Sequence, residues 1–200
     1  MGYADYRFRP NQASVYSTEI FYRSEHTPRY QAEMLFKFEV MALASECVSL
    51  TGWYRIDDFP ASETRLGSDF VNTQRPKPAL LAFQWFNRLF ARPTRLVRTR
   101  VARPPQSQSV VDVFQSNGGV IIVGWLRSSL SSEVADKFGM LEDRRSETVS
   151  VELPCAQSKL EGWFNAEGRR VRRQARIVNH WLDEIRQRDG QVVIAELAST

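Results

Sequence analysis

The sequence contains few of the residues that bind metals or form disulfides. Among 200 residues there are two cysteines, Cys47 and Cys155, and two histidines, His26 and His180, all far apart in the chain. Zinc sites need Cys or His ligands at short spacings, and disulfide scaffolds need more cysteines. We therefore expect no metal site, no cofactor and two buried thiols.

Long apolar runs are absent as well. No stretch of roughly eighteen apolar residues occurs, as a membrane helix would require. The first residues, 1–12, lack the apolar segment of a secretory signal. Because 42% of the residues are hydrophobic and 12% aromatic, the chain has enough apolar surface for a core. The sequence predicts a soluble protein without a targeting segment, and its compartment stays unknown.

The net charge of +4 comes from the second half of the chain. Residues 1–91 hold ten basic and ten acidic side chains, whereas residues 92–200 hold seventeen and thirteen. Five arginines lie close together, namely Arg169, Arg170, Arg172, Arg173 and Arg176. Apolar residues separate them at strand spacing, which is typical of a solvated face. We therefore expect neither nucleic acid nor a membrane as a partner.

The first half opens with a strand pattern and a helix pattern. Residues 13–20 predict a buried strand, and a helix should begin at Thr27 and Pro28, which suit a helix N-terminus. The apolar stripe of this helix, which we expect to face inward, consists of Tyr30, Met34, Leu35, Phe38, Met41 and Ala42.

The same alternation continues to about residue 91. Residues 47–54 predict a second buried strand, residues 55–75 a long loop, and the residues from Pro76 onward a second helix. Alternating strands and helices favour a parallel sheet, in which ligands bind at the carboxyl ends of the strands. Glu19 and Trp53 lie at two such ends.

After residue 91 the pattern changes to short strands separated by turn signals. The Asn117-Gly118 step predicts a tight hairpin, in which both residues would adopt the positive φ angles of a two-residue turn. The strands predicted in this half cover residues 95–102, 110–115, 120–125, 147–153, 159–165, 170–178 and 192–197. Regular short strands of this kind indicate an antiparallel β-sandwich.

Three motifs of the first half share one family pattern. They are Ser-Thr-Glu-Ile at 17–20, Thr-Pro-Arg-Tyr-Gln-Ala at 27–32 and Gly-Trp-Tyr-Arg-Ile-Asp-Asp at 52–58. Together they resemble the clan A glycoside hydrolases, whose seventh barrel strand ends in Thr-Glu and whose eighth ends in Trp. The resemblance implies an α/β plus all-β fold. Residues 1–91 would be the last two strand–helix units of a TIM barrel, and residues 92–200 an accessory β-sandwich.

The resemblance also assigns roles to four residues. Glu19 would be the nucleophile, Trp53 the platform under the sugar ring, and Tyr54 or Asp57 a polar contact to the substrate. Without the motifs, Glu19 would be interpreted as a solvated loop residue and Trp53 as a core aromatic, and these alternatives stay open.

One of the two carboxylates that such an enzyme needs is not found in the sequence. A retaining glycosidase needs a second carboxylate about 5 Å from the nucleophile. In the family this glutamate usually follows an Asn on the fourth strand, and the sequence contains no Asn-Glu pair. We expect a fragment of an enzyme that cleaves β-glycosidic bonds, inactive alone. Its partners would be a carbohydrate substrate and a companion chain with the remaining barrel strands.

Two further functions compete with this interpretation. A non-enzymatic carbohydrate-binding or interaction module would present a row of exposed aromatics, but Trp125, Trp163 and Trp181 have apolar neighbours that favour a core position. A regulatory or structural protein that uses the basic face would bind its partner with a steep salt dependence.

Overall fold

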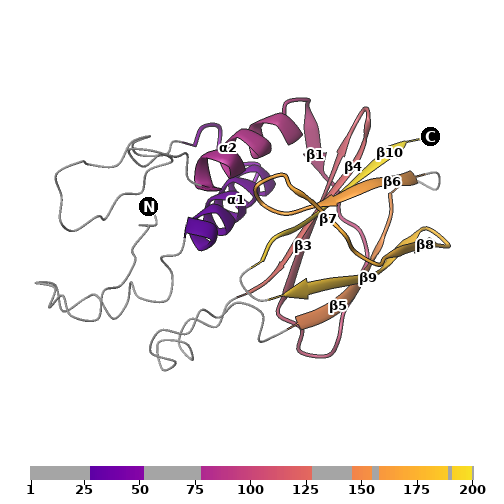
Figure 1. Ribbon diagram of the computed structural model, residues 1–200. Helices are drawn as coiled ribbons and strands as arrows, with labels where there is room; N and C mark the ends of the chain where they lie inside the picture. The colour runs from indigo at the N-terminus through magenta and orange to yellow at the C-terminus, as the bar shows by residue number, and fades with distance from the viewer. Residues whose placement is uncertain (1–27, 52–77, 128–145, 155–157, 189–190, 200) are drawn as a thin grey trace, which may run out of the picture. The chain divides into compact units, whose positions relative to one another are not determined.

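The protein is described here by a computed structural model that covers residues 28–51, 78–127, 146–154, 158–188 and 191–199 (Figure 1). The chain divides into two compact units, residues 1–84 with 129–141 and residues 85–128 with 142–200. The described residues form two helices and ten strands, and every strand pair among them is antiparallel. The fold is therefore mixed α/β with mainly antiparallel sheet.

The helix α1 (Pro28–Ala44) begins where the sequence predicts it. Proline suits the first helical position because its missing N–H needs no partner there. The helix ends at Ala44, and two residues later Glu46 has a left-handed φ of 54° and donates its amide to the Leu43 carbonyl at 3.3 Å.

The buried face of α1 differs from the predicted one. Phe38 and Met41, expected inside, are 41% and 49% exposed. Three ionisable side chains expected outside, Glu33, Lys37 and Glu39, are at most 4% exposed. The segment is apolar around most of its circumference, so periodicity alone does not select one face.

The predicted buried strand at 47–54 is wrong over the residues that the structure describes. Residues 47–51 form no strand, and Val48 and Leu50 are exposed. Cys47, expected to be a buried thiol, is an exposed free cysteine. A strand forms only against a neighbouring strand, and none of the described strands pairs with residues 47–51. The predicted strand at 13–20 and Cys155 lie outside the described residues.

The second predicted helix is confirmed as α2 (Pro78–Leu89). In the first unit, Ala79 and Ala82 of α2 form a buried cluster with Ala32 and Leu35 of α1. Small side chains at these positions allow close packing of the two helices. The last residues of α2, from Trp85, belong to the second unit.

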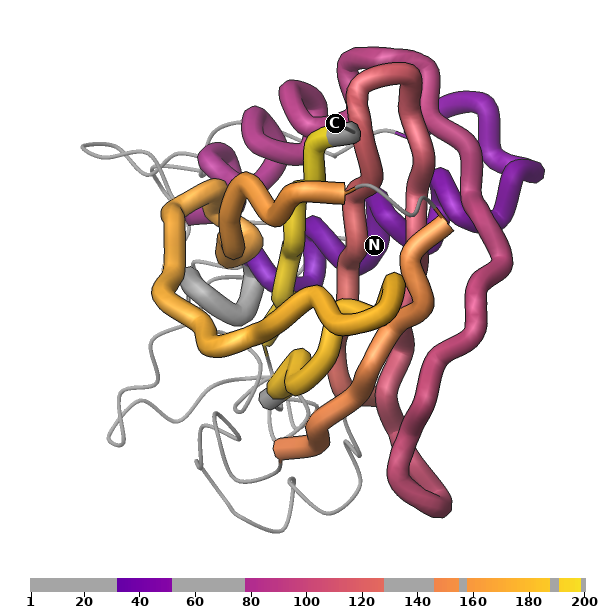
Figure 2. Tube along the Cα trace, turned by 90° about the vertical axis from the view of Figure 1, so that its right-hand side faces the viewer, coloured from indigo at the N-terminus to yellow at the C-terminus, as the bar shows by residue number. Residues whose placement is uncertain are grey.

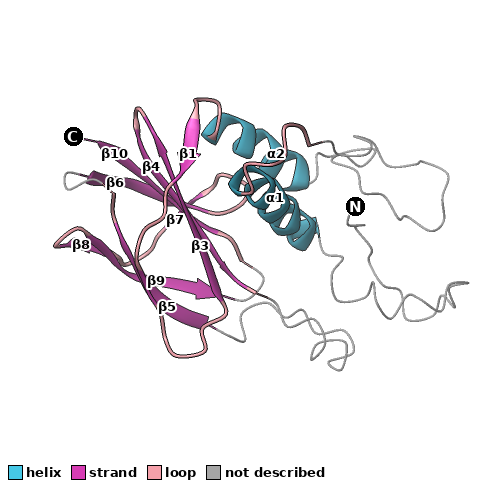
Figure 3. Ribbon diagram, turned by 180° about the vertical axis from the view of Figure 1, so that it is seen from behind, coloured by secondary structure: helices cyan, strands magenta, loops and turns pink. Residues whose placement is uncertain are grey.

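The second unit is a sandwich of two sheets, shown by secondary structure in Figure 3. Six strands form one sheet in the order β1-β3-β4-β10-β6-β7, and four form the other in the order β2-β5-β9-β8. The strands are β1 (Thr94–Leu96), β2 (Val101–Ala102), β3 (Ser109–Ser116), β4 (Gly119–Leu126), β5 (Ser146–Glu152), β6 (Ser158–Phe164), β7 (Arg170–Val171), β8 (Arg176–Val178), β9 (Trp181–Arg188) and β10 (Val193–Ser199).

The core of the sandwich contains residues from both sheets. Val113, Ile122 and Ala195 from the larger sheet cluster with Val149 and Leu182 from the smaller one, and all five are at most 3% exposed. On β5, for example, buried Val149 and Val151 alternate with more exposed neighbours, as a strand with one face inward requires. The antiparallel sandwich predicted from the second half of the sequence is confirmed.

The predicted hairpin is confirmed as β3 and β4, which run side by side in Figure 2. Its turn differs from the expected one, because neither Asn117 nor Gly118 has a positive φ. The left-handed residue is Gly119, with a φ of 154°. A Cβ atom at Gly119 would lie 2.0 Å from the carbonyl oxygen of Leu197, so β10 approaches this backbone too closely for any side chain.

Two predicted strands cross from one sheet to the other. The stretch 95–102 divides into β1 and β2, and the stretch 170–178 divides into β7 and β8. In both cases the first part pairs in the six-stranded sheet and the second in the four-stranded sheet. The β-forming pattern is local, but the choice of partner strand is a tertiary property.

Candidate functional site

The residues that the sequence proposes for catalysis and sugar binding are Glu19, Trp53, Tyr54 and Asp57. All four lie outside the described residues. Their roles stay predictions.

The segment that leads toward Trp53 has one described contact. The hydroxyl of Thr51 donates a hydrogen bond of 2.7 Å to Oε2 of Glu39 on α1. Glu39 is 3% exposed, and its other oxygen, Oε1, has no hydrogen-bond partner among the described residues. A buried carboxylate oxygen without a hydrogen-bond partner lowers the stability of the fold. Glu39 is therefore a polar side chain buried within the first unit.

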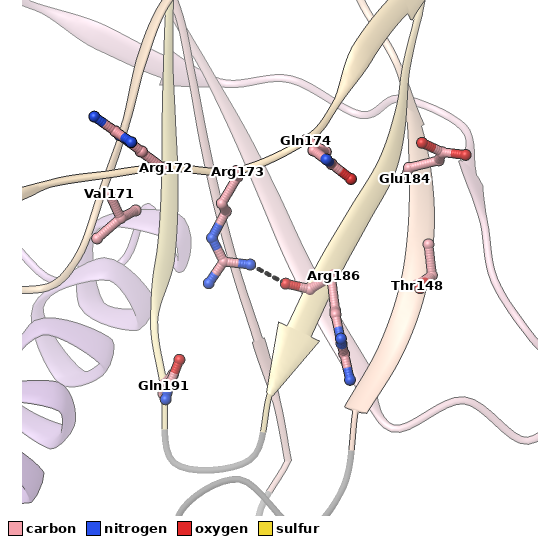
Figure 4. Close-up of a pocket in the computed structure, with 8 residues that line it drawn as sticks. All are labelled: Thr148, Val171, Arg172, Arg173, Gln174, Glu184, Arg186 and Gln191. Carbon is pink, nitrogen blue, oxygen red and sulfur yellow. Dashed lines mark hydrogen bonds between the residues drawn. The ribbon is translucent and has the colours of Figure 1, made fainter.

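The second unit contains a separate candidate, an open cleft of about 880 Å³. Its lining residues come from β5, β7, β9 and the connections that follow β7 and β9 (Figure 4). They are Thr148, Val171, Arg172, Arg173, Gln174, Glu184, Arg186 and Gln191. With three arginines and one glutamate, the lining is mainly cationic. We call it the basic cleft.

A bulge in β9 shapes one wall of the basic cleft. Thr148 and Val149 of β5 pair with Arg186 and Ile185, but Val151 pairs with Leu182, so β9 has one extra residue between them. Glu184 lies in this bulge with a φ of 60°, which is uncommon for a residue with a side chain. Bulges of this kind often occur beside functional sites, where they redirect side chains.

The second wall is the connection between β7 and β8. Half-buried Arg173 donates a hydrogen bond from its guanidinium to the backbone carbonyl of Arg186, drawn as a dashed line in Figure 4. The guanidinium of Arg186 in turn donates to the hydroxyl of Ser146 at 3.2 Å. Arg172 points away from Arg173 in the same view. Two of the three arginines are therefore held in place by neighbouring groups.

The one acidic residue of the basic cleft is paired with a further arginine. The carboxylate of Glu184 lies 3.7 Å from the guanidinium of Arg176. Both side chains are exposed, so the pair adds little stability, but it offsets the negative charge of Glu184. The other charged residues of the lining are Arg172, Arg173 and Arg186.

The sequence indicates only part of this site. Arg172 and Arg173 were expected on the solvated face of a strand, whereas residues 172–175 form no strand and the two arginines line a cleft. Arg186 lies on β9, which the sequence pattern does not predict. The run of arginines is a visible signal, but the bulge and the cleft are not.

One further carboxyl group has a perturbed titration. Burial raises the pKa of Asp112 on β3 above 3.8, although the nearby Arg103 guanidinium acts in the opposite direction. Asp112 pairs in register with Val123 of β4, which is fully buried. No partner that would give this carboxyl a catalytic role is evident among its described neighbours.

Three other properties of the described residues bear on function. No group of three His, Cys, Asp or Glu side chains that could hold a metal ion occurs within the described ranges. Neither α1 nor α2 is long and apolar enough to cross a membrane. Trp125 and Trp163 are at most 5% exposed, which confirms their expected core positions, and Trp181 is half-buried.

Comparison with known proteins gives a likeness in fold. No protein-family model matches the sequence, and no curated protein matches it. Among solved structures, a family 39 glycoside hydrolase from the gut symbiont Bacteroides cellulosilyticus WH2 is similar to this chain with a TM-score of 0.57 at 12% identity. The similarity covers 89% of this chain and 32% of that enzyme's chain, so this chain spans about a third of its length. At this identity the likeness concerns the fold.

Proposed function

We propose that this chain is the C-terminal part of a retaining clan A glycoside hydrolase. In this proposal, residues 1–91 supply the last two units of the catalytic barrel, and residues 92–200 form the accessory sandwich. The observation that carries it is the fold likeness to a family 39 glycoside hydrolase over 89% of the chain. The motifs around Glu19 and Trp53 point to the same clan independently of the fold.

The proposed chemistry is a two-step displacement. Glu19 attacks the anomeric carbon and forms a covalent glycosyl-enzyme, while a second carboxylic acid protonates the leaving oxygen. Trp53 lies under the sugar ring, and Tyr54 or Asp57 binds one of its hydroxyl groups. The second carboxylic acid comes from a companion chain with the other barrel strands, so the 200-residue chain alone has no hydrolase activity.

The carbohydrate-binding module is the less favoured function. Such modules present exposed aromatic rings on one sheet, whereas two of the three tryptophans of the described sandwich strands are buried. A glycosidase relation agrees better with this distribution.

A covalent label tests the proposal in the presence of the companion strands. A tagged copy of the chain is expressed in its native cells and treated with a panel of 2-deoxy-2-fluoro β-glycosides that carry a good leaving group. These compounds trap the glycosyl-enzyme, so the peptide that contains Glu19 should gain the mass of the sugar. Glu19→Gln should abolish the label, and Glu25→Gln, a matched change in the same region, should retain it.

The outcomes separate the parts of the proposal. A label on another carboxylate would remove Glu19 as the nucleophile, and no label with any glycoside would remove the glycosidase function. The purified chain is also assayed with aryl β-glycosides. Hydrolysis that Glu19→Gln abolishes would show that the chain contains its own acid, which contradicts the need for a companion.

A further inference from the structure

The turn between β3 and β4 contains the one Asn-Gly step of the sequence, Asn117-Gly118. Both residues are exposed. The strands on either side are fixed, because Ser116 and Gly119 form the last pair of the β3–β4 ladder and β10 packs closely against Gly119. The turn therefore presents an asparagine side chain and the following glycine amide to water, and neither the proposed catalysis nor the basic cleft uses them.

We propose that Asn117 is a site of spontaneous covalent modification, at which the chain converts this asparagine into aspartate and isoaspartate. The backbone nitrogen of Gly118 loses its proton and bonds to Cγ of Asn117. The bond from Cγ to the side-chain nitrogen breaks, that nitrogen takes up a proton and leaves as ammonia, and a succinimide ring remains. Water then opens the ring at either of its carbonyl groups, adding its hydroxyl to the carbonyl carbon and its proton to the ring nitrogen. The product at position 117 is aspartate or isoaspartate, depending on which carbonyl reacts.

The attacking nitrogen of Gly118 is accessible and only weakly held. Because Gly118 has no Cβ, no side chain crowds its nitrogen, and its backbone can adopt conformations that other residues disfavour. Its N–H donates a hydrogen bond of 3.3 Å to the hydroxyl of Ser116. That hydroxyl in turn donates to the carbonyl of Gly119 at 3.5 Å, a long hydrogen bond. Loss of the Gly118 proton therefore breaks no hydrogen bond of the β3–β4 ladder.

A guanidinium lies beside the reacting peptide group. A Cβ atom at Gly118 would lie 2.9 Å from the guanidinium of Arg92. Arg92 comes two residues before Thr94, which pairs with Ser116 of β3, so the sheet brings this arginine to the turn. The Gly118 nitrogen carries negative charge once its proton is lost, and a positive charge nearby favours that form. The carboxylate of the product is favoured for the same reason.

Two other asparagines in turns of the sandwich show why exposure alone does not suffice. Asn179 is exposed, with a φ of 47°, but His180 follows it. Asn165 accepts a hydrogen bond of 2.8 Å from the amide of Arg169 on its side-chain oxygen, and buried Ala166 follows it. In both cases the next residue has a Cβ atom that hinders attack by its nitrogen. These two asparagines are therefore internal controls within the same unit.

The reaction is measured on the purified chain of 200 residues, incubated in its folded state at neutral and at mildly alkaline pH. In peptide mapping by mass spectrometry, the peptide with Asn117 should gain the mass difference between an amide and an acid and separate into two isomers. The rate should rise with pH, because the attacking nitrogen must lose its proton. The peptides with Asn165 and Asn179 should keep their amides. If Asn117 reacts only after unfolding in urea, the hairpin protects it and the proposal is overturned.

Substitutions test the mechanism. Gly118→Ala should slow the reaction about tenfold or more, because a Cβ beside the attacking nitrogen raises the barrier. Arg92→Gln should slow it several-fold, whereas Arg98→Gln, which removes another exposed arginine, should leave the rate unchanged. Circular dichroism of each variant confirms that it is folded. A rate that Gly118→Ala leaves unchanged, or a product without isoaspartate, would refute the cyclisation. Equal effects of Arg92→Gln and Arg98→Gln would refute the role of the Arg92 guanidinium.

A second source of isoaspartate must be distinguished from Asn117. The Asp189-Gly190 step, which lies outside the described residues, has the sequence to form the same ring, but it releases water rather than ammonia. Its product therefore has the mass of the starting chain, whereas the product at position 117 does not. Isoaspartate confined to the peptide with Asp189 would overturn the proposal. Since Glu19 takes no part in these measurements, their result does not depend on the proposed glycosidase function.

Discussion

The fully buried side chain of Gln187 accepts a hydrogen bond of 2.6 Å from the hydroxyl of Ser109. Its amide nitrogen donates to the carbonyl of Val110 at 3.3 Å, so one glutamine on β9 satisfies two groups of β3. These strands belong to different sheets. The sandwich is thus joined by a specific polar link in addition to its apolar core.

Loss of this link should destabilise the fold. Ser109→Ala leaves Oε1 of Gln187 buried without a partner, which should lower the free energy of unfolding by about 1–3 kcal/mol. Urea unfolding followed by fluorescence measures the change. Ser150→Ala, a similar exchange at a half-buried position of β5, should cost less than about 0.5 kcal/mol. Equal effects of the two exchanges would contradict the importance of the link.

Gly119 should tolerate no side chain. Gly119→Ala places a Cβ atom 2.0 Å from the Leu197 carbonyl oxygen, so β4 and β10 must separate locally. We expect the free energy of unfolding to fall by about 2 kcal/mol or more. At neighbouring Gly118 the Cβ would lie 2.9 Å from the guanidinium of Arg92, which is exposed and can move, and 4.0 Å from the hydroxyl of Ser116. Gly118→Ala should cost less than half as much, and the reverse order would refute the turn geometry.

Asp112 should make stability depend on pH. Because burial raises the pKa of this carboxyl in the folded state, the folded chain holds the proton more tightly than the unfolded chain. Its contribution is complete below the unfolded pKa and is lost as the pH rises through the folded pKa. Asp112→Asn has no proton to lose. The free energy of unfolding of the variant, minus that of the wild type, should therefore rise from acidic to neutral pH in urea titrations. A constant or falling difference would contradict the burial of this group.

Cys47 should react readily in the folded chain. Its side chain is exposed and forms no disulfide. A chromogenic disulfide reagent added without denaturant should detect a fast thiol, and Cys47→Ser should remove that fast phase, because reactivity requires access to the thiolate. A fast phase of unchanged size in Cys47→Ser would mean that the exposed thiol is a different one.

The sequence predicts those parts of the fold that depend on residues close together in the chain. Pro28 and Pro78 mark helix starts, and the Asn117-Gly118 step marks the hairpin, because caps and turns form between residues close in sequence. The strand β9 was not predicted. Its bulge at Glu184 interrupts the alternation of apolar and polar residues from which a strand is predicted.

The remaining features of the fold and of the site depend on tertiary contacts. The buried face of α1 could not be inferred, because that helix is apolar on most sides. The basic cleft brings Thr148 together with Arg173 and Gln191, which are distant in sequence, and their proximity depends on how the strands pair. The roles of Glu19, Trp53, Tyr54 and Asp57 stay predictions that the labelling experiment addresses.

The segment from β7 to β8 contains residues that pack against the core and residues that line the surface. Val171 and Ala175 pack against the apolar core, while Arg172, Arg173 and Gln174 between them line the basic cleft. The distance between Arg173 and β9 is therefore set by how the core is filled. A change of one methyl group at Ala175, which carries no charge, alters the spacing of charges on the outside. The packing of the interior and the spacing of charged side chains on the surface consequently vary together.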